Sequence, residues 1–156
     1  MAPPESVADG RPRSLRDLWL ALRVLVLLIK LRVQLRFVEL PLLLARIAPT
    51  GAPDDPDGDR LARVRAIVDG WIWRLPEIRT RPCLVRSVLL WRFARRAGLP
   101  VEVTIGVRKQ DGRVQGHSWL TLDGEPYLER ATLDPSWQVI FRSGADAPGT
   151  PAVRAR

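Results

Sequence analysis

The spacing of the apolar residues changes once along this chain of 156 residues, and that change sets the fold class. Before Gly98 the apolar residues recur every three or four positions, as on one face of an α-helix. After Pro100 they alternate with polar residues, as in a half-buried strand. Helices followed by a small antiparallel sheet make an α+β fold. With 46% hydrophobic residues, the chain can build the core of one such domain.

The stretch from residue 15 to 48 is strongly apolar, and it is predicted to be helical with a break or kink at Pro41. One narrow stripe of this helix carries Arg16, Arg23 and Lys30. Another face carries Leu18, Leu22, Leu25 and Ile29. The longest uncharged apolar run there covers only residues 24–29, which is too short for a membrane span.

This helix has more apolar surface than one contact with a small core would cover, so two interpretations stay open. In the first, the rest of the domain wraps around it and it is a core helix. In the second, it is a surface for a partner protein or for the membrane interface, with its basic side chains reaching toward the polar side.

Two shorter helices are predicted after a linker rich in Pro, Gly and Asp at residues 48–59. One covers residues 60–75 and is ended by Pro76. The other covers residues 82–97, and Thr80 is a suitable N-cap for it. The exposed positions of this last helix are predicted to carry Arg86, Arg92, Arg95 and Arg96.

The strands are predicted over residues 101–107 and 114–122, with a third that begins at residues 127–129. Asp123 and Gly124 form a hairpin signal between the last two. Both ends of the chain, residues 1–14 and 143–156, are rich in Pro and small residues and are predicted to be disordered. The expected folded parts are therefore the apolar segment 15–48 and a domain over residues 60–142.

The net charge of +8 is carried by arginine, since Lys30 and Lys109 are the only lysines. The basic residues are spread along the whole chain, and no nucleic-acid motif or aromatic-basic strand pattern is present. We therefore expect no nucleic-acid partner. The composition is rich in Arg, Ala, Pro and Gly together, which is typical of a bias in codon composition and accounts for the basic charge.

One cysteine and one histidine exclude an internal disulfide and are too few for a zinc site. We expect neither a metal nor another cofactor. Residues 1–14 lack the apolar core of a secretory signal. A free thiol is typical of a reducing compartment, so we expect a cytoplasmic protein, with peripheral membrane association through residues 15–48 as an open alternative.

Cys83 is predicted in the first turn of its helix, where free N–H groups and the helix dipole stabilise a thiolate. Arg81 and Arg86 can add to that stabilisation. His117 is predicted within a strand, where a rigid imidazole can act as general base and then general acid beside a thiol. The competing interpretations are a buried structural cysteine and a structural histidine of the sheet.

Glu129 is the predicted orienting group for His117, and its role depends on the hairpin register. A three-residue turn with Gly124 in the bulge position would place Glu129 directly opposite His117. A two-residue turn would pair Glu129 with Ser118 and turn the carboxylate away from His117. Otherwise Glu129 is an ordinary exposed strand carboxylate. The backbone N–H of Cys83 is the expected oxyanion donor.

Five motifs in this order resemble the transglutaminase-like cysteine peptidases of lasso-peptide biosynthesis, known as B proteins. They are Pro82–Ser87, Arg95–Pro100, Ile105–Val107, Gly116–Trp119 and Asp123–Gly124. The resemblance is strong from Pro82 to Glu129 and looser over the apolar, Arg-rich region before it. It implies a transglutaminase-like, papain-like core in which N-terminal apolar helices pack on a small antiparallel sheet.

The resemblance also implies an activity: a thiol hydrolase that removes the leader from a ribosomally made precursor peptide. The family's catalytic Cys and His fall on Cys83 and His117, and its acidic residue falls on Glu129, where the family more usually has Asp. We expect no leader-recognition domain in this chain, so the resemblance implies as partners the precursor peptide, a separate leader-recognition protein and a cyclase. The alternatives are a transglutaminase-like acyltransferase and a non-catalytic, partner-binding module of the same fold.

Overall fold

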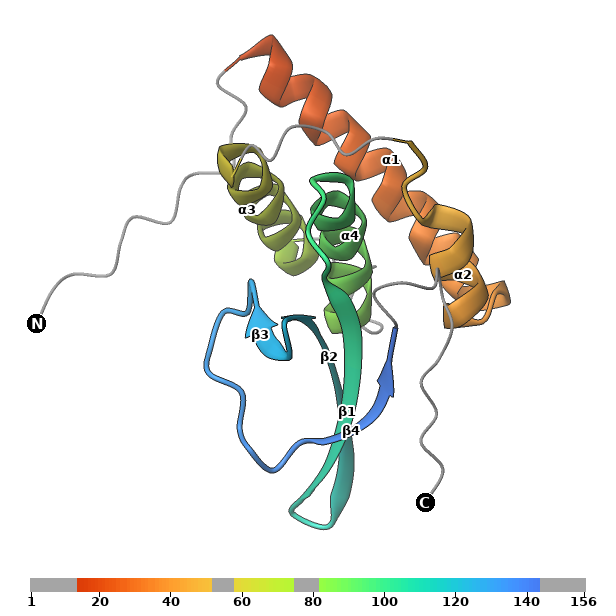
Figure 1. Ribbon diagram of the computed structural model, residues 1–156, viewed down its shortest axis with the longest axis vertical. Helices are drawn as coiled ribbons and strands as arrows, with labels where there is room; N and C mark the ends of the chain where they lie inside the picture. Colours follow the sequence, from red (N-terminus) through yellow and green to blue (C-terminus); the bar gives the residue numbers. More distant parts are fainter. Residues whose placement is uncertain (1–13, 52–57, 75–81, 144–156) are drawn as a thin grey trace, which may run out of the picture.

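The computed structural model describes residues 14–51, 58–74 and 82–143, and in these residues helices precede an antiparallel sheet (Figure 1). The helices are α1 (Leu15–Phe37), α2 (Leu40–Ile47), α3 (Gly58–Arg74) and α4 (Pro82–Arg96). The strands are β1 (Glu102–Gln110), β2 (Arg113–Leu122), β3 (Glu125–Tyr127) and β4 (Gln138–Arg142). The predicted α+β class is confirmed.

The apolar stretch 15–48 forms two helices, as the proline predicted. Val38 leaves the helix in an extended conformation, and Pro41 lies in the first turn of α2, where its missing N–H is not needed. At the other end, the side chain of Ser14 accepts a hydrogen bond of 3.1 Å from the Asp17 backbone N–H and caps α1. Ser14 therefore belongs to the fold and not to the predicted disordered end.

All four helices and the sheet contribute to one hydrophobic core. The members of this core that are fully enclosed include Val24, Leu31, Leu43, Leu44, Val64, Val68, Val88, Leu89, Leu90, Val103 and Leu120. The interpretation of residues 15–48 as a core element is thus correct for one face of α1.

The opposite face of α1 is exposed, although it is also apolar. Its large exposed side chains are Leu15, Leu18, Trp19, Leu22, Val26, Ile29, Val33 and Phe37, which we call the outer stripe. Three of the four residues predicted to form the apolar face, Leu18, Leu22 and Ile29, lie in this stripe. The buried face is instead formed by Ala21, Val24, Leu28 and Leu31.

The sheet has the order β3-β2-β1-β4, and every neighbouring pair is antiparallel. β4 was not predicted, since it is short and its partner β1 is far away in the sequence. Just after β4, Ser143 is buried: its Oγ accepts a hydrogen bond of 2.8 Å from the Val103 N–H, and its own N–H donates to Val103 O at 2.9 Å. The predicted disordered end at residue 143 is therefore wrong for Ser143 itself.

The hairpin between β2 and β3 has the two-residue turn, one of the two registers that the sequence left open. Leu122 pairs with Glu125, and Asp123 and Gly124 between them have φ angles of 52° and 87°. Two residues with positive φ make the turn that best matches strand twist, and this preference decides the register. β3 ends at Tyr127, so it begins and ends earlier than predicted. It is an edge strand, as Pro126 indicated.

Candidate active site

Cys83 is the second residue of α4, at the end of the helix that lies next to β2. The free N–H groups of a helix N-terminus surround this position. The backbone of Leu84 and of Ser118 both form hydrogen bonds that favour the thiolate. Thr80 and Arg81, the predicted cap and the predicted neighbouring cation, lie outside the described residues. Cys83 is half-buried, so the sulfur is not sealed inside the core.

His117 lies in the middle of β2, directly opposite Gly106 of β1. Its ring stacks on Trp119, with centroids 5.8 Å apart, and meets Trp137 at 5.6 Å. Gly106 permits this arrangement, because a Cβ at that position would lie 2.6 Å from Trp119 Cη2. The two indoles therefore restrict how the imidazole can rotate.

The two predicted reactive groups meet in the structure: the side chains of Cys83 and His117 form a hydrogen bond. Burial alone would raise the pKa of the Cys83 thiol, but the bond to His117, the Ser118 backbone and the imidazolium charge lower it below its ordinary value of 9.0. The bonds to Cys83 and then Glu129 raise the pKa of His117 to about 9, against the opposing effect of burial. The geometry thus favours a thiolate paired with an imidazolium.

Glu129 also reaches His117, by a route that the sequence did not indicate. The chain leaves the β2–β3 ladder after Tyr127, and Leu128 has a positive φ of 58°. This turn of the backbone brings Glu129 Oε2 to 3.4 Å from His117 Nε2. The pairing of Glu129 with Ser118, expected for a two-residue turn, is not made.

Arg86 was predicted to be exposed, and this prediction is wrong: the residue is only 8% exposed. Its Nη1 donates to Glu129 Oε1 at 2.9 Å, and its Nη2 donates to the backbone oxygen of Leu128 at 2.6 Å. Its Nε donates to Asp69 Oδ1 of α3 at 2.7 Å. Arg86 therefore holds the carboxylates of the site and does not stabilise the thiolate directly.

Further arginines complete the network behind Glu129. Arg65 donates to the backbone oxygen of Glu129 at 3.1 Å, and Arg130 Nε lies 3.2 Å from Asp69 Oδ2. The signal that could have revealed the role of Arg86 is its spacing: residues 83 and 86 are three apart and share one face of a helix. Among the described residues, no group of three or more His, Cys, Asp and Glu side chains is placed to bind a metal ion.

The chain belongs to the transglutaminase-like superfamily, whose family model matches residues 24–142. The match begins within α1 and ends with the last residue of β4, so it covers the parts that build the core and the candidate site. This superfamily includes cysteine peptidases and acyltransferases. No curated protein and no solved structure matches the chain.

Proposed function

We propose that this protein is a cysteine peptidase that removes the leader from a ribosomally made precursor peptide in lasso-peptide maturation. The observation that carries the proposal is the hydrogen-bonded pair of Cys83 and His117, with Glu129 Oε2 at 3.4 Å from His117 Nε2. A thiolate at a helix N-terminus beside an oriented imidazole is the arrangement of an acyl-forming thiol enzyme. The motif resemblance supplies the substrate class.

The proposed reaction has two stages. First, the Cys83 thiolate attacks the carbonyl carbon of the scissile peptide bond, and the Cys83 N–H at the start of α4 stabilises the developing oxyanion. The His117 imidazolium then gives its proton to the departing amine as the C–N bond breaks, which leaves a thioester. Next, water attacks the thioester while neutral His117 takes its proton. The C–S bond breaks, the acid is released, and the thiolate–imidazolium pair is restored.

An acyltransferase is the second candidate, because it would share the same thioester. In that case an amine replaces water in the second stage. The released acyl product is then heavier than the acid from hydrolysis by the mass of the amine less one water. Cys83 is half-buried, so a thioester on it would be open to attack by water or by an amine. The mass of the product separates the two reactions.

The test first searches the neighbouring genes for a short precursor peptide, a leader-recognition protein and a cyclase, and then combines these with the protein. Mass spectrometry should detect a free leader and a core that begins with a new amine. Cys83→Ala should abolish cleavage and keep the fold, as judged by circular dichroism. Cleavage at the wild-type rate by this variant would refute the proposal.

A non-catalytic module is the remaining alternative, and a thiol-specific electrophile tests it without a known substrate. Because Cys83 is the single cysteine of the chain, one adduct reports on one site. Rapid labelling near neutral pH supports an activated thiol. If the labelling rate of Cys83 were no higher in the folded protein than in the urea-unfolded chain, the non-catalytic module would be favoured.

A further inference from the structure

The outer stripe of α1 is apolar surface that the core does not use. Apart from the neighbours Leu18 and Trp19, its successive members are three or four residues apart, so they stay on one side of the helix. With 23 residues in α1, the stripe can extend about 34 Å at 1.5 Å per residue. In the described part of the chain nothing covers it: Ile29 near its middle is 53% exposed, and Phe37 at its end is 82% exposed.

Basic residues border this stripe on both sides. At about 100° per residue, one flank of the helix carries Arg16, Arg23 and Lys30. The other flank carries Arg36, which is exposed, and Arg32, which is half-buried and has a buried Nη1. The one acidic residue of α1, Asp17, projects toward α3, where its Oδ1 lies 3.1 Å from Arg63 Nη1. The stripe and its two borders thus hold positive charge and no negative charge of their own.

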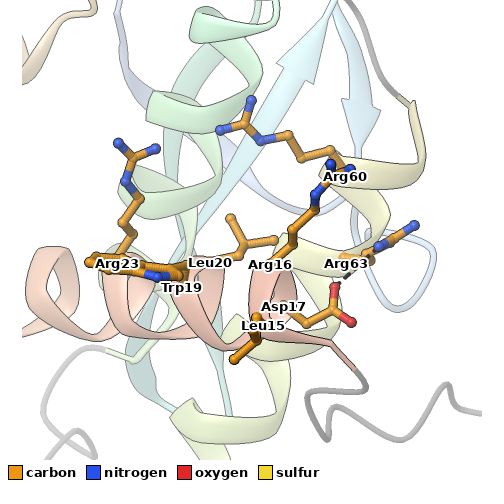
Figure 2. A pocket seen from close by; sticks show the side chains of 8 residues that line it. All are labelled: Leu15, Arg16, Asp17, Trp19, Leu20, Arg23, Arg60 and Arg63. Atoms are coloured by element: carbon orange, nitrogen blue, oxygen red, sulfur yellow. Dashed lines mark hydrogen bonds and ion pairs between the residues drawn. The ribbon is translucent and has the colours of Figure 1, made fainter.

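A hollow of about 740 Å³ lies beside one end of the stripe, between α1 and α3. Figure 2 shows Arg16 and Arg23 rising from α1 on the side where Arg60 of α3 reaches across. Asp17 is the one acid among the described residues of its lining, and Arg63 already pairs with it. The guanidinium groups of Arg16 and Arg23 at this hollow are suited to an anion.

A second hollow, of about 360 Å³, continues along the same flank toward α4 and is lined in part by Trp19, Arg92 and Arg96. Burial, and then the charge of Arg96, lower the pKa of the Arg92 guanidinium. Arg92 Nη1 donates to the backbone oxygen of Ile47, and the charges of Arg92 and Arg96 together make this hollow positive. Both hollows adjoin the outer stripe through Trp19.

We propose that α1 lies in the headgroup layer of an anionic membrane, with the outer stripe toward the acyl chains and its arginines on lipid phosphates. A straight, convex stripe with aromatic and aliphatic side chains and basic flanks is the pattern of interfacial helices. Long basic side chains there reach from the apolar boundary to the headgroups. None of the described helices has the length and apolar character of a membrane span, so the helix would lie on the surface.

The basic border on both flanks favours a lipid surface over a partner helix. Headgroups surround an interfacial helix, so cations on either side find phosphates. A helix docked on the stripe would need acidic residues along both of its own edges and an equally straight apolar face of similar length. In Figure 1, α1 lies on the side of α3 and α4 that faces away from β3, so membrane contact along α1 would not cover β3. The proposal does not depend on the chemistry of Cys83.

The test is co-sedimentation of the full-length protein with vesicles of phosphatidylglycerol or of phosphatidylcholine. The wild type should sediment with the anionic vesicles, bind phosphatidylcholine at least tenfold more weakly, and lose binding as salt increases. Ile29→Asp should lose most of the binding. Ile140→Asp is the matched control, because Ile140 is 60% exposed but lies on β4, and it should bind as the wild type does.

The two lysines of the chain provide a matched pair for the charge contribution. Lys30→Gln, beside the stripe, should weaken binding to anionic vesicles about fivefold, whereas Lys109→Gln on β1 should leave it unchanged. No sedimentation with anionic vesicles, or equal binding to phosphatidylcholine, would overturn the proposal. A second result would also overturn it: the wild type forms a concentration-dependent dimer and binds no vesicles, and Ile29→Asp abolishes the dimer. A second copy of the chain would then cover the outer stripe.

Discussion

Arg86 and Glu129 form a hydrogen-bonded ion pair of 2.9 Å in which each side chain is about nine-tenths buried. Arg86 Nη1 binds one carboxylate oxygen, Oε1, so the other oxygen, Oε2, is left to face His117 at 3.4 Å. This division of one carboxylate between two partners gives a physical reason for Glu at position 129. The side chain is long enough to be held from behind by a guanidinium while it still meets the imidazole.

The first prediction is that Arg86 sets the position of Glu129. Arg86→Met leaves Glu129 and Asp69 without their shared cation, and breaking a buried pair in this way costs about 3–5 kcal/mol of unfolding free energy. Arg86→Lys keeps the charge but cannot donate in the same three fixed directions, so it should fold and still lose activity. Urea denaturation and the rate of precursor cleavage measure the two effects.

Arg113 provides the control for these variants. It is an exposed residue of β2, and Arg113→Lys should change neither stability nor rate beyond experimental error. If Arg86→Lys cleaved the precursor at the wild-type rate, the guanidinium would not be needed to position Glu129.

The second prediction concerns the charge of Glu129. Glu129→Gln has the same shape, but it removes the negative charge that helps to raise the pKa of His117 to about 9. The pKa of His117 should therefore fall. Because the chain has a single histidine, the imidazole can be followed as one titrating NMR signal in untagged protein. A pKa that stayed near 9 in this variant would assign the whole shift to Cys83.

The positions of Cys83 and His117 in the fold could be predicted from the sequence because each has a local signal. Cys83 follows Pro82 at the start of a helix, and His117 lies in an alternating strand, so both positions can be read from neighbouring residues. The α+β class follows from the same two periodicities.

The rest of the site depends on contacts between residues far apart in the sequence, which local patterns do not predict. Arg86 is buried because its face of α4 meets Asp69 of α3 and the chain after β3, which are distant in sequence. Glu129 reaches His117 through the positive φ of Leu128, a conformation that its residue type does not predict. β4 pairs with β1 across a long connection, so its existence depends on the whole fold.

The third prediction is the pH dependence of the thiol and of cleavage. A lowered pKa at Cys83 means that the thiolate persists below pH 9.0, so the alkylation rate should reach half its maximum at a lower pH than in the unfolded chain. His117→Ala removes the hydrogen bond and the positive charge, while burial remains, so the midpoint should move to higher pH. Alkylation by iodoacetamide across the range from about pH 5 to 10 measures both midpoints.

Cleavage needs a second proton-bearing group, which makes its profile differ from that of alkylation. In the proposed reaction the His117 imidazolium supplies a proton to the leaving amine, and the pKa of His117 is about 9. As the pH rises through that value, cleavage should fall while alkylation does not. If both rates kept rising together above pH 9, His117 would not be the general acid.

The last prediction uses two glycines of the β1–β2 ribbon. A Cβ at Gly106 would lie 2.6 Å and 2.9 Å from Trp119 ring atoms and 3.2 Å from the backbone oxygen of Gln138. Gly106→Ala must therefore displace the indole that stacks on His117, or move β4. We expect a loss of about 1–3 kcal/mol in unfolding free energy, as for other overpacked sites, together with slower cleavage.

Gly116 is the matched control, because it is next to His117 in β2 and a Cβ there meets nothing within 4 Å. Gly116→Ala should leave stability unchanged or raise it by up to about 1 kcal/mol, since alanine restricts the unfolded chain. Thermal denaturation and the His117 NMR signal compare the two variants directly. Gly106→Ala could destabilise the protein and still keep the wild-type His117 pKa and cleavage rate. In that case the packing of Trp119 would not orient His117.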